Sequence, residues 1–155
     1  KDLNNEQTKF NINKGIIIHT LLSYIKFADD IESSINKAVF DGIIPVSEKT
    51  TYEKLIAKIL SNNKIKEYFS REWKIFNEAD IIDLDGKIYR PDRILIKNNE
   101  VVIIDYKTGS ESPDNEKQLH NYAKILTKMG YTKIDKFLWY IRNDEAETIK
   151  VKEVK

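Results

Sequence analysis

The alternation of hydrophobic and polar residues divides the chain into a helical first part and a strand-rich second part. Between residues 15 and 69, apolar side chains recur at three- and four-residue spacings, which is the period of amphipathic helices. Gly42 and Pro45 interrupt this pattern, and a further helix is expected over residues 47–60. Residues 1–14 are polar and rich in asparagine, so we expect them to form a linker or irregular arm.

The pattern changes to that of β-strands beyond the helical part. Residues 73–84, 88–96 and 101–106 are rich in isoleucine, valine and aromatic side chains. Two turn sequences separate these segments, Asp85-Gly86 and a pair of asparagines, and asparagine tolerates a positive φ. The three segments therefore predict a three-stranded antiparallel meander.

The last part of the chain predicts one more helix and two strands. A polar loop over residues 109–115 is followed by a helix that ends at Met129-Gly130, with glycine in the usual stop position. Residues 137–141 and 148–154 have the pattern of short strands. This order predicts an α/β fold in which helices flank a mixed central sheet, made of the meander plus further strands, with an N-terminal helical segment.

The composition is that of one globular domain. The chain has 155 residues, of which 41% are hydrophobic and 33% are charged. It contains no cysteine, which excludes disulfides, zinc fingers and iron–sulfur clusters. No apolar run approaches the roughly 20 residues of a membrane-spanning helix, and no secretory signal opens the chain. We therefore expect a cytoplasmic protein that has no membrane partner.

Charge is informative only locally, because the net charge is +1. Basic residues outnumber acidic ones between Lys54 and Lys74. Between Lys117 and Lys136 there are five lysines and a single acidic residue. For each stretch taken alone, a solvated helix face is favoured over a track for phosphates.

The most informative chemistry lies in the meander. If Asn98-Asn99 forms a two-residue hairpin loop, Asp92 lies directly opposite Asp105, with their Cβ atoms about 5 Å apart. Strand alternation puts Lys107 on the same face. Two facing carboxylates repel each other unless a cation lies between them, and Mg²⁺ or Mn²⁺ suits oxygen ligands. The pattern predicts a metal site for phosphodiester hydrolysis.

A surface salt bridge is the alternative explanation for this trio. Two features oppose it: Asp105 follows four apolar residues, a costly place for an unpartnered charge, and Pro91 marks an irregularity in the strand. The inference depends on turn length, because a three-residue loop would shift the register by one.

These residues also resemble a known family. Pro91-Asp92, Asp105-Tyr106-Lys107 and the pair Gln118 and Tyr122 are similar to the PD-(D/E)XK nuclease superfamily, in particular to its RecB/AddA-like branch in UvrD/Rep-type helicase-nucleases. The resemblance implies a restriction-endonuclease-like core, with residues 15–155 as a single nuclease domain. Iron–sulfur members of this branch use four cysteines, so that subgroup is excluded.

The resemblance also implies roles for individual residues. Asp92 and Asp105 match the metal-binding carboxylates, and the backbone carbonyl of Tyr106 completes the metal shell in the family. Lys107 matches the catalytic lysine, so Lys107, Asp105 and Asp92 form the expected catalytic set. His19 matches the histidine ligand on the first helix, although its apolar neighbours alone favour a buried core histidine.

Three further residues are weaker candidates. Glu72 resembles the glutamate that opens the first strand, but a two-residue loop at Asp85-Gly86 points it to the other face, so we expect an accessory role. Gln118 and Tyr122 are helix neighbours that alone indicate only polar surface. With the resemblance, they become candidates for positioning DNA.

The functional hypothesis is a Mg²⁺- or Mn²⁺-dependent deoxyribonuclease, an exonuclease module of a DNA-repair helicase-nuclease, with DNA and an attached or associated helicase as partners. The chain opens on Lys1 rather than methionine, which suggests the C-terminal part of a larger protein. One alternative is a catalytically inactive DNA-binding or assembly domain. Another is a stand-alone restriction or RNA-processing nuclease.

Overall fold

Helices occupy most of the first half of the molecule. The computed structural model describes residues 2–142 and 147–155, and for residues 2–12 only the backbone is described. The helical elements are α1 (Asp2–Tyr24), η1 (Ala28–Asp30), α2 (Ile31–Phe40), η2 (Val46–Glu48), α3 (Lys49–Leu60), η3 (Lys66–Phe69) and α4 (Pro113–Lys128). The expected linker over residues 1–14 is therefore wrong from residue 2 onward, because α1 begins there.

The strands form a mixed sheet. They are β1 (Lys74–Asn77), β2 (Ile81–Ile82), β3 (Ile88–Tyr89), β4 (Arg93–Lys97), β5 (Glu100–Lys107), β6 (Lys133–Ile141) and β7 (Ile149–Val154). Five of them pair in the order β1-β4-β5-β6-β7, while β2 and β3 form a small separate hairpin. The β5–β6 pair is parallel and the other pairs are antiparallel. The predicted α/β fold with a mixed sheet is confirmed.

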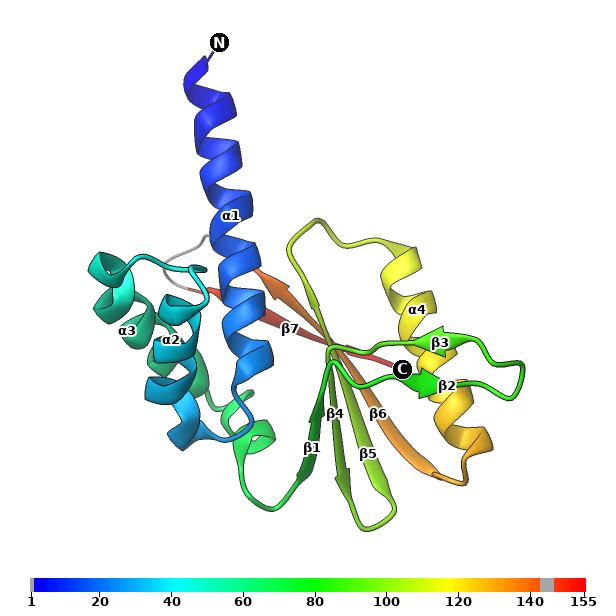
Figure 1. Ribbon diagram of the computed structural model, residues 1–155. Coiled ribbons are helices and arrows are strands. Elements are labelled where there is room, and N and C mark those ends of the chain that lie inside the picture. Colours follow the sequence, from blue (N-terminus) through cyan, green and yellow to red (C-terminus); the bar gives the residue numbers. More distant parts are fainter. Residues whose placement is uncertain (1, 143–146) are drawn as a thin grey trace.

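The two faces of the sheet carry separate cores, because alternate side chains of each strand point to opposite faces. On one face Val102, Ile104 and Trp139 pack with the first three helices. On the other face Ile103 and Leu138 pack with α4. Helices α1–α3 and helix α4 thus lie on opposite sides of the sheet (Figure 1).

The turn at Asn98-Asn99 has the predicted length. Lys97 pairs with Glu100, and Arg93 pairs with Ile104 further along the same ladder. Asn98 has a φ of 55°, the left-handed conformation that asparagine accepts. This register places Asp92, one residue before β4, opposite Asp105, as the sequence predicts.

The turn predicted at Asp85-Gly86 is one residue longer than expected. The backbone N–H groups of Asp83 and Gly86 bond to the carbonyls of Lys87 and Asp83, respectively, so the loop has three residues, and Gly86 has a φ of 77°. The long strands predicted on either side are each broken in two, as β1 with β2 and β3 with β4. The corrected register puts Glu78, rather than an odd-numbered residue, opposite Asp92, and the Glu78 N–H bonds to the Asp92 carbonyl at 2.9 Å.

A buried arginine joins α1 to the sheet. Arg93 is 0% exposed, and its guanidinium donates to the carbonyls of Ile25, Lys26 and Tyr68 and to the side-chain oxygen of Asn77, at 2.7–2.9 Å. These acceptors belong to three separate parts of the chain, including the segment that leaves α1. Arg93 therefore ties the segment that follows α1 to β4 and η3.

Candidate active site

Three candidate metal ligands meet where α1 approaches the ends of β1 and β4. His19 comes from α1, Glu78 follows β1, and Asp92 precedes β4. One ligand atom from each of these side chains lies within 4.8 Å of the other two, and His19 Nε2 is 3.2 Å from Asp92 Oδ1. Gly15, one turn before His19, lets α1 lie close to Thr108, which follows β5, because a Cβ at this position would lie 3.1 Å from Thr108 Cγ2.

Contacts with Tyr106 and an unusual backbone conformation at Glu78 orient this group of ligands. The second oxygen of Asp92 accepts the backbone N–H of Tyr106 at 2.6 Å. The buried Tyr106 ring contacts the His19 ring edge-to-face, with centroids 5.3 Å apart. Glu78 has a φ of 48°, a left-handed conformation that is unusual for glutamate and that turns the chain out of β1.

The second part of the site lies on β5. Asp105 is 3% exposed, and its Oδ2 is 2.5 Å from Lys107 Nζ. The same ammonium donates to Gln118 Oε1 at 2.7 Å, and Gln118 Nε2 donates to the Tyr122 hydroxyl at 2.8 Å. Helix α4 thus holds the lysine through two side chains that lie one turn apart.

Titration shifts show that negative charge is crowded here. The pKa of Asp105 is raised to about 6: burial is the largest cause, the Asp92 carboxylate adds to it, and Lys107 and His19 act in the opposite direction. The hydrogen bond to Asp92 raises the pKa of His19 above its usual value, against the effect of burial. A bound divalent cation would relieve this repulsion.

The structure brings most of the predicted site residues together. His19, Asp92, Asp105 and Lys107 converge with the Gln118–Tyr122 pair from α4. His19 is a partly exposed member of this cluster rather than a core histidine.

Glu72 is not part of this cluster, which corrects its expected accessory role. It forms an ion pair of 2.6 Å with Lys97, at the opposite end of β4. Six residues separate it from Glu78, roughly 20 Å along an extended chain. Glu78 is the glutamate that lies beside His19 and Asp92. The sequence alone does not indicate Glu78, because a two-residue turn at Asp85-Gly86 would place an odd-numbered residue opposite Asp92.

Comparison with known proteins identifies the family. The sequence matches the PD-(D/E)XK nuclease superfamily over residues 4–155. The chain belongs to this superfamily. Membership indicates a nuclease, a hydrolase of phosphodiester bonds, and PD-(D/E)XK nucleases typically use Mg²⁺ or Mn²⁺. The acidic group around Asp92 is a candidate site for such an ion.

Other comparisons add little to this assignment. Among solved structures, the crystal structure of SSO0001 has 17% sequence identity and a TM-score of 0.39, over 99% of this chain and 79% of that one. No curated protein gives a significant match. Within the described residues, no helix of this PD-(D/E)XK domain is long and apolar enough to cross a membrane.

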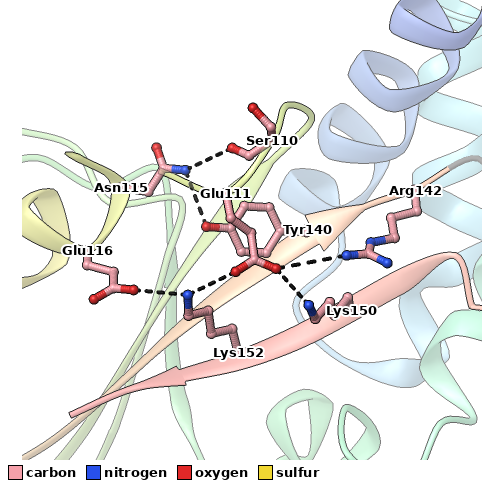
Figure 2. A network of polar contacts seen from close by, with 8 residues as sticks. All are labelled: Ser110, Glu111, Asn115, Glu116, Tyr140, Arg142, Lys150 and Lys152. Carbon is pink, nitrogen blue, oxygen red and sulfur yellow. Dashed lines mark hydrogen bonds and ion pairs between the residues drawn. The ribbon is translucent and has the colours of Figure 1, made fainter. Parts of the chain in front are cut away.

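An ion-pair network fixes the loop between Lys107 and α4 in this PD-(D/E)XK domain. The Glu111 carboxylate lies 2.7 Å from Lys150 Nζ and 2.9 Å from Lys152 Nζ, and Lys152 also reaches Glu116 at 3.0 Å (Figure 2). Asn115 donates weakly to Ser110 and Tyr140 beside this group. The network ties the loop and the start of α4 to β7, and so supports the placement of Gln118.

We expect the Glu111 network to make stability depend on pH. The two lysines lower the pKa of Glu111 from 4.5 to about 2, so its ion pairs stabilise the fold above about pH 4.5 and lose their effect as the pH falls toward 2. Glu111→Gln should therefore lower the melting temperature at pH 7, and the gap to wild type should close between pH 4.5 and 2. Circular dichroism melts measure this.

Glu32→Gln is the matched control, because this exposed carboxylate forms no ion pair within the described part of the chain. It should melt like the wild type at every pH. A gap for Glu111→Gln that stays constant down to pH 2 would contradict the assignment.

Proposed function

We propose that this chain is a Mg²⁺- or Mn²⁺-dependent deoxyribonuclease. The observation that carries the proposal is that ligand atoms of His19, Glu78 and Asp92 lie within 4.8 Å of one another, next to the buried Asp105 and its half-buried partner Lys107. Hard oxygen donors with one imidazole suit these two ions. A catalytically inactive relative would be expected to have lost at least one member of this set.

The donor set fits a divalent cation. His19, Glu78, Asp92 and Asp105 would hold it, and Tyr106 offers a further oxygen. The N–H and C=O of a strand residue face the same neighbouring strand, so the Tyr106 carbonyl lies on the side where its N–H meets Asp92. When bound, the ion supplies Lewis acidity, which lowers the pKa of coordinated water and neutralises charge on the phosphate.

Lys107 supplies the second function of the site. Its ammonium is fixed between Asp105 and Gln118, so it presents a proton donor at one position without an entropic cost during reaction. There it can orient an attacking water or stabilise the additional negative charge of a phosphorane-like transition state. Tyr122 keeps the Gln118 amide oriented through its hydroxyl.

We further propose that the domain belongs to the RecB/AddA-like branch and acts as an exonuclease module of a DNA-repair helicase-nuclease, with an attached or associated helicase. The support is the histidine on the first helix, together with the Gln-x-x-x-Tyr pair that contacts the lysine. A stand-alone restriction or RNA-processing nuclease is the second candidate.

Cleavage assays test the proposal. Purified protein should degrade end-labelled linear DNA with Mg²⁺ or Mn²⁺ and not with EDTA, and it should spare circular DNA and RNA if it is a DNA exonuclease. Cleavage of circles or of RNA would favour the second candidate. Binding of Mn²⁺ without cleavage of any of these substrates, in the isolated domain and in the full reading frame, would contradict a nuclease.

The affinity for Mn²⁺ should distinguish the roles of Glu78 and Glu72. We expect Glu78→Gln to weaken Mn²⁺ binding by roughly tenfold or more, because it removes one anionic donor from the cluster. Glu72→Gln, the matched control, should bind Mn²⁺ like the wild type, because Glu72 pairs with Lys97 far from the site. Isothermal titration calorimetry measures both, and the reverse ranking would refute the placement of Glu78.

A further inference from the structure

Two hollows border the outer surface of α4 and lead away from the active site. The first, of about 300 Å³, is lined by Tyr89 from β3 and by Lys117, Gln118 and Asn121 from α4. Gln118 is the residue that holds the Lys107 ammonium, so this hollow begins one side chain from the proposed catalytic lysine. The second hollow runs along α4 and shares two lining residues, Lys117 and Asn121, with the first, so the two lie side by side.

Unpaired positive charge follows this path. Lys117 and Lys124 are exposed, lie two helical turns apart, and form no ion pair with any described residue. Glu116 pairs with Lys152 instead, and Lys128 pairs with Asp83. The acid that remains in the first hollow is Asp114, at the start of α4.

An aromatic ring forms the wall opposite α4. Tyr89 is half-buried and packs edge-to-face on Tyr122, with ring centroids 6.2 Å apart. Lys87 Nζ lies 5.0 Å from the centroid of the Tyr89 ring. A positive groove combined with an aromatic platform is the usual way in which proteins bind single-stranded nucleic acid, because bases stack on the ring while lysines meet the phosphates.

We propose that a single polynucleotide strand passes from the active site over α4. The nucleotide next to the scissile phosphate occupies the first hollow, with its base on Tyr89, and the following phosphates contact Lys117 and Lys124. Asn121, between them, can bond to a base edge. The inference rests on the proposed nuclease function and adds to it the path of the strand.

Binding measured without cleavage tests this path. Fluorescence anisotropy with labelled oligothymidylate, in Ca²⁺ in place of Mg²⁺, gives the affinity at several salt concentrations. Lys117→Gln/Lys124→Gln should reduce the salt slope by about 1.4, since each lost phosphate contact on a single strand accounts for about 0.7, and should weaken binding roughly tenfold. Tyr89→Ala should also weaken binding roughly tenfold, while Tyr89→Phe, which keeps the ring, should bind like the wild type.

Lys54→Gln/Lys66→Gln is the matched control. It removes the same charge from exposed positions on the helices of the opposite face and should leave both affinity and slope unchanged. The proposal is overturned if the Lys117/Lys124 variant behaves like this control, if Tyr89→Ala binds normally, or if the wild type binds no oligonucleotide.

Two further results distinguish failure of the proposed strand path from failure of the proposed nuclease function. Irradiation of wild-type protein with a 5-iodouracil oligonucleotide should cross-link at Tyr89 or on α4, by mass spectrometry, which does not depend on how well a variant folds. Cross-links confined to the helices of the opposite face would overturn the path. A protein that binds through Tyr89, Lys117 and Lys124 but never cleaves would refute the proposed function and leave the path standing.

Discussion

Replacing Lys107 by alanine is expected to lower the rate of DNA cleavage by roughly 10²–10⁴-fold, the range typical of a positioned proton donor. The ammonium lies 2.5 Å from Asp105 and 2.7 Å from Gln118, so water that takes its place will not be held with the same precision. The fold should persist, because Asp105, whose pKa is already raised to about 6, can take up a proton when its partner is removed. Single-turnover cleavage of labelled linear DNA at saturating Mn²⁺ measures the effect.

Asp105→Ala should reduce cleavage at least as much, since it removes both a metal ligand and the partner of Lys107. Lys97→Ala is the matched control for charge: this lysine pairs with Glu72 at the far end of the sheet, and cleavage should be unaffected. Near-normal cleavage by Lys107→Ala, with full loss of cleavage in EDTA, would show that this lysine is structural.

The second large effect is expected on stability. Arg93→Leu should lower the free energy of unfolding by roughly 3–5 kcal/mol, because three carbonyls and the Asn77 side chain lose a buried donor. The guanidinium also stacks on Phe69, 4.0 Å from the ring centroid, and that packing changes too. Urea unfolding followed by circular dichroism measures the loss, and the melting temperature should fall by roughly 10 °C.

Arg71→Leu is the control for removing an arginine. Its ion pair with Asp29 is exposed, so the loss of stability should be much smaller than for Arg93→Leu. The loss of stability in Arg93→Lys should lie between the losses in Arg71→Leu and Arg93→Leu, because a single ammonium cannot reach acceptors from three parts of the chain. Equal losses for Arg71→Leu and Arg93→Leu would show that burial of the guanidinium contributes little.

The core of the site could be predicted because it depends on local rules. A two-residue turn at Asn98-Asn99 fixes the pairing of β4 with β5, and strand alternation then places Asp92, Asp105 and Lys107 on one face. Both rules act within one hairpin, so nothing distant in the chain can change them.

Predictions that depended on distant parts of the chain succeeded only in part. The resemblance to a family indicated His19, but the rotation of α1 that points it at Asp92 is set by packing against the sheet. The four acceptors around Arg93 come from the segment that follows α1, from η3 and from β1, and no local pattern brings them together. The helical conformation of residues 2–14 was likewise missed, because their polar composition shows no apolar face.

The sequence by itself determined the order of elements, the register of one hairpin and, through it, a carboxylate pair with a lysine beside it. The tertiary structure decided which glutamate completes the cluster: the extra residue in the turn at Asp85-Gly86 places Glu78 opposite Asp92, whereas Glu72 lies at the other end of β4. It also decided where α4 lies, and with it the path from Lys107 past Tyr89. The physical reason is range, since turns and alternation act between neighbours, whereas a site assembled from five elements depends on how their buried faces pack.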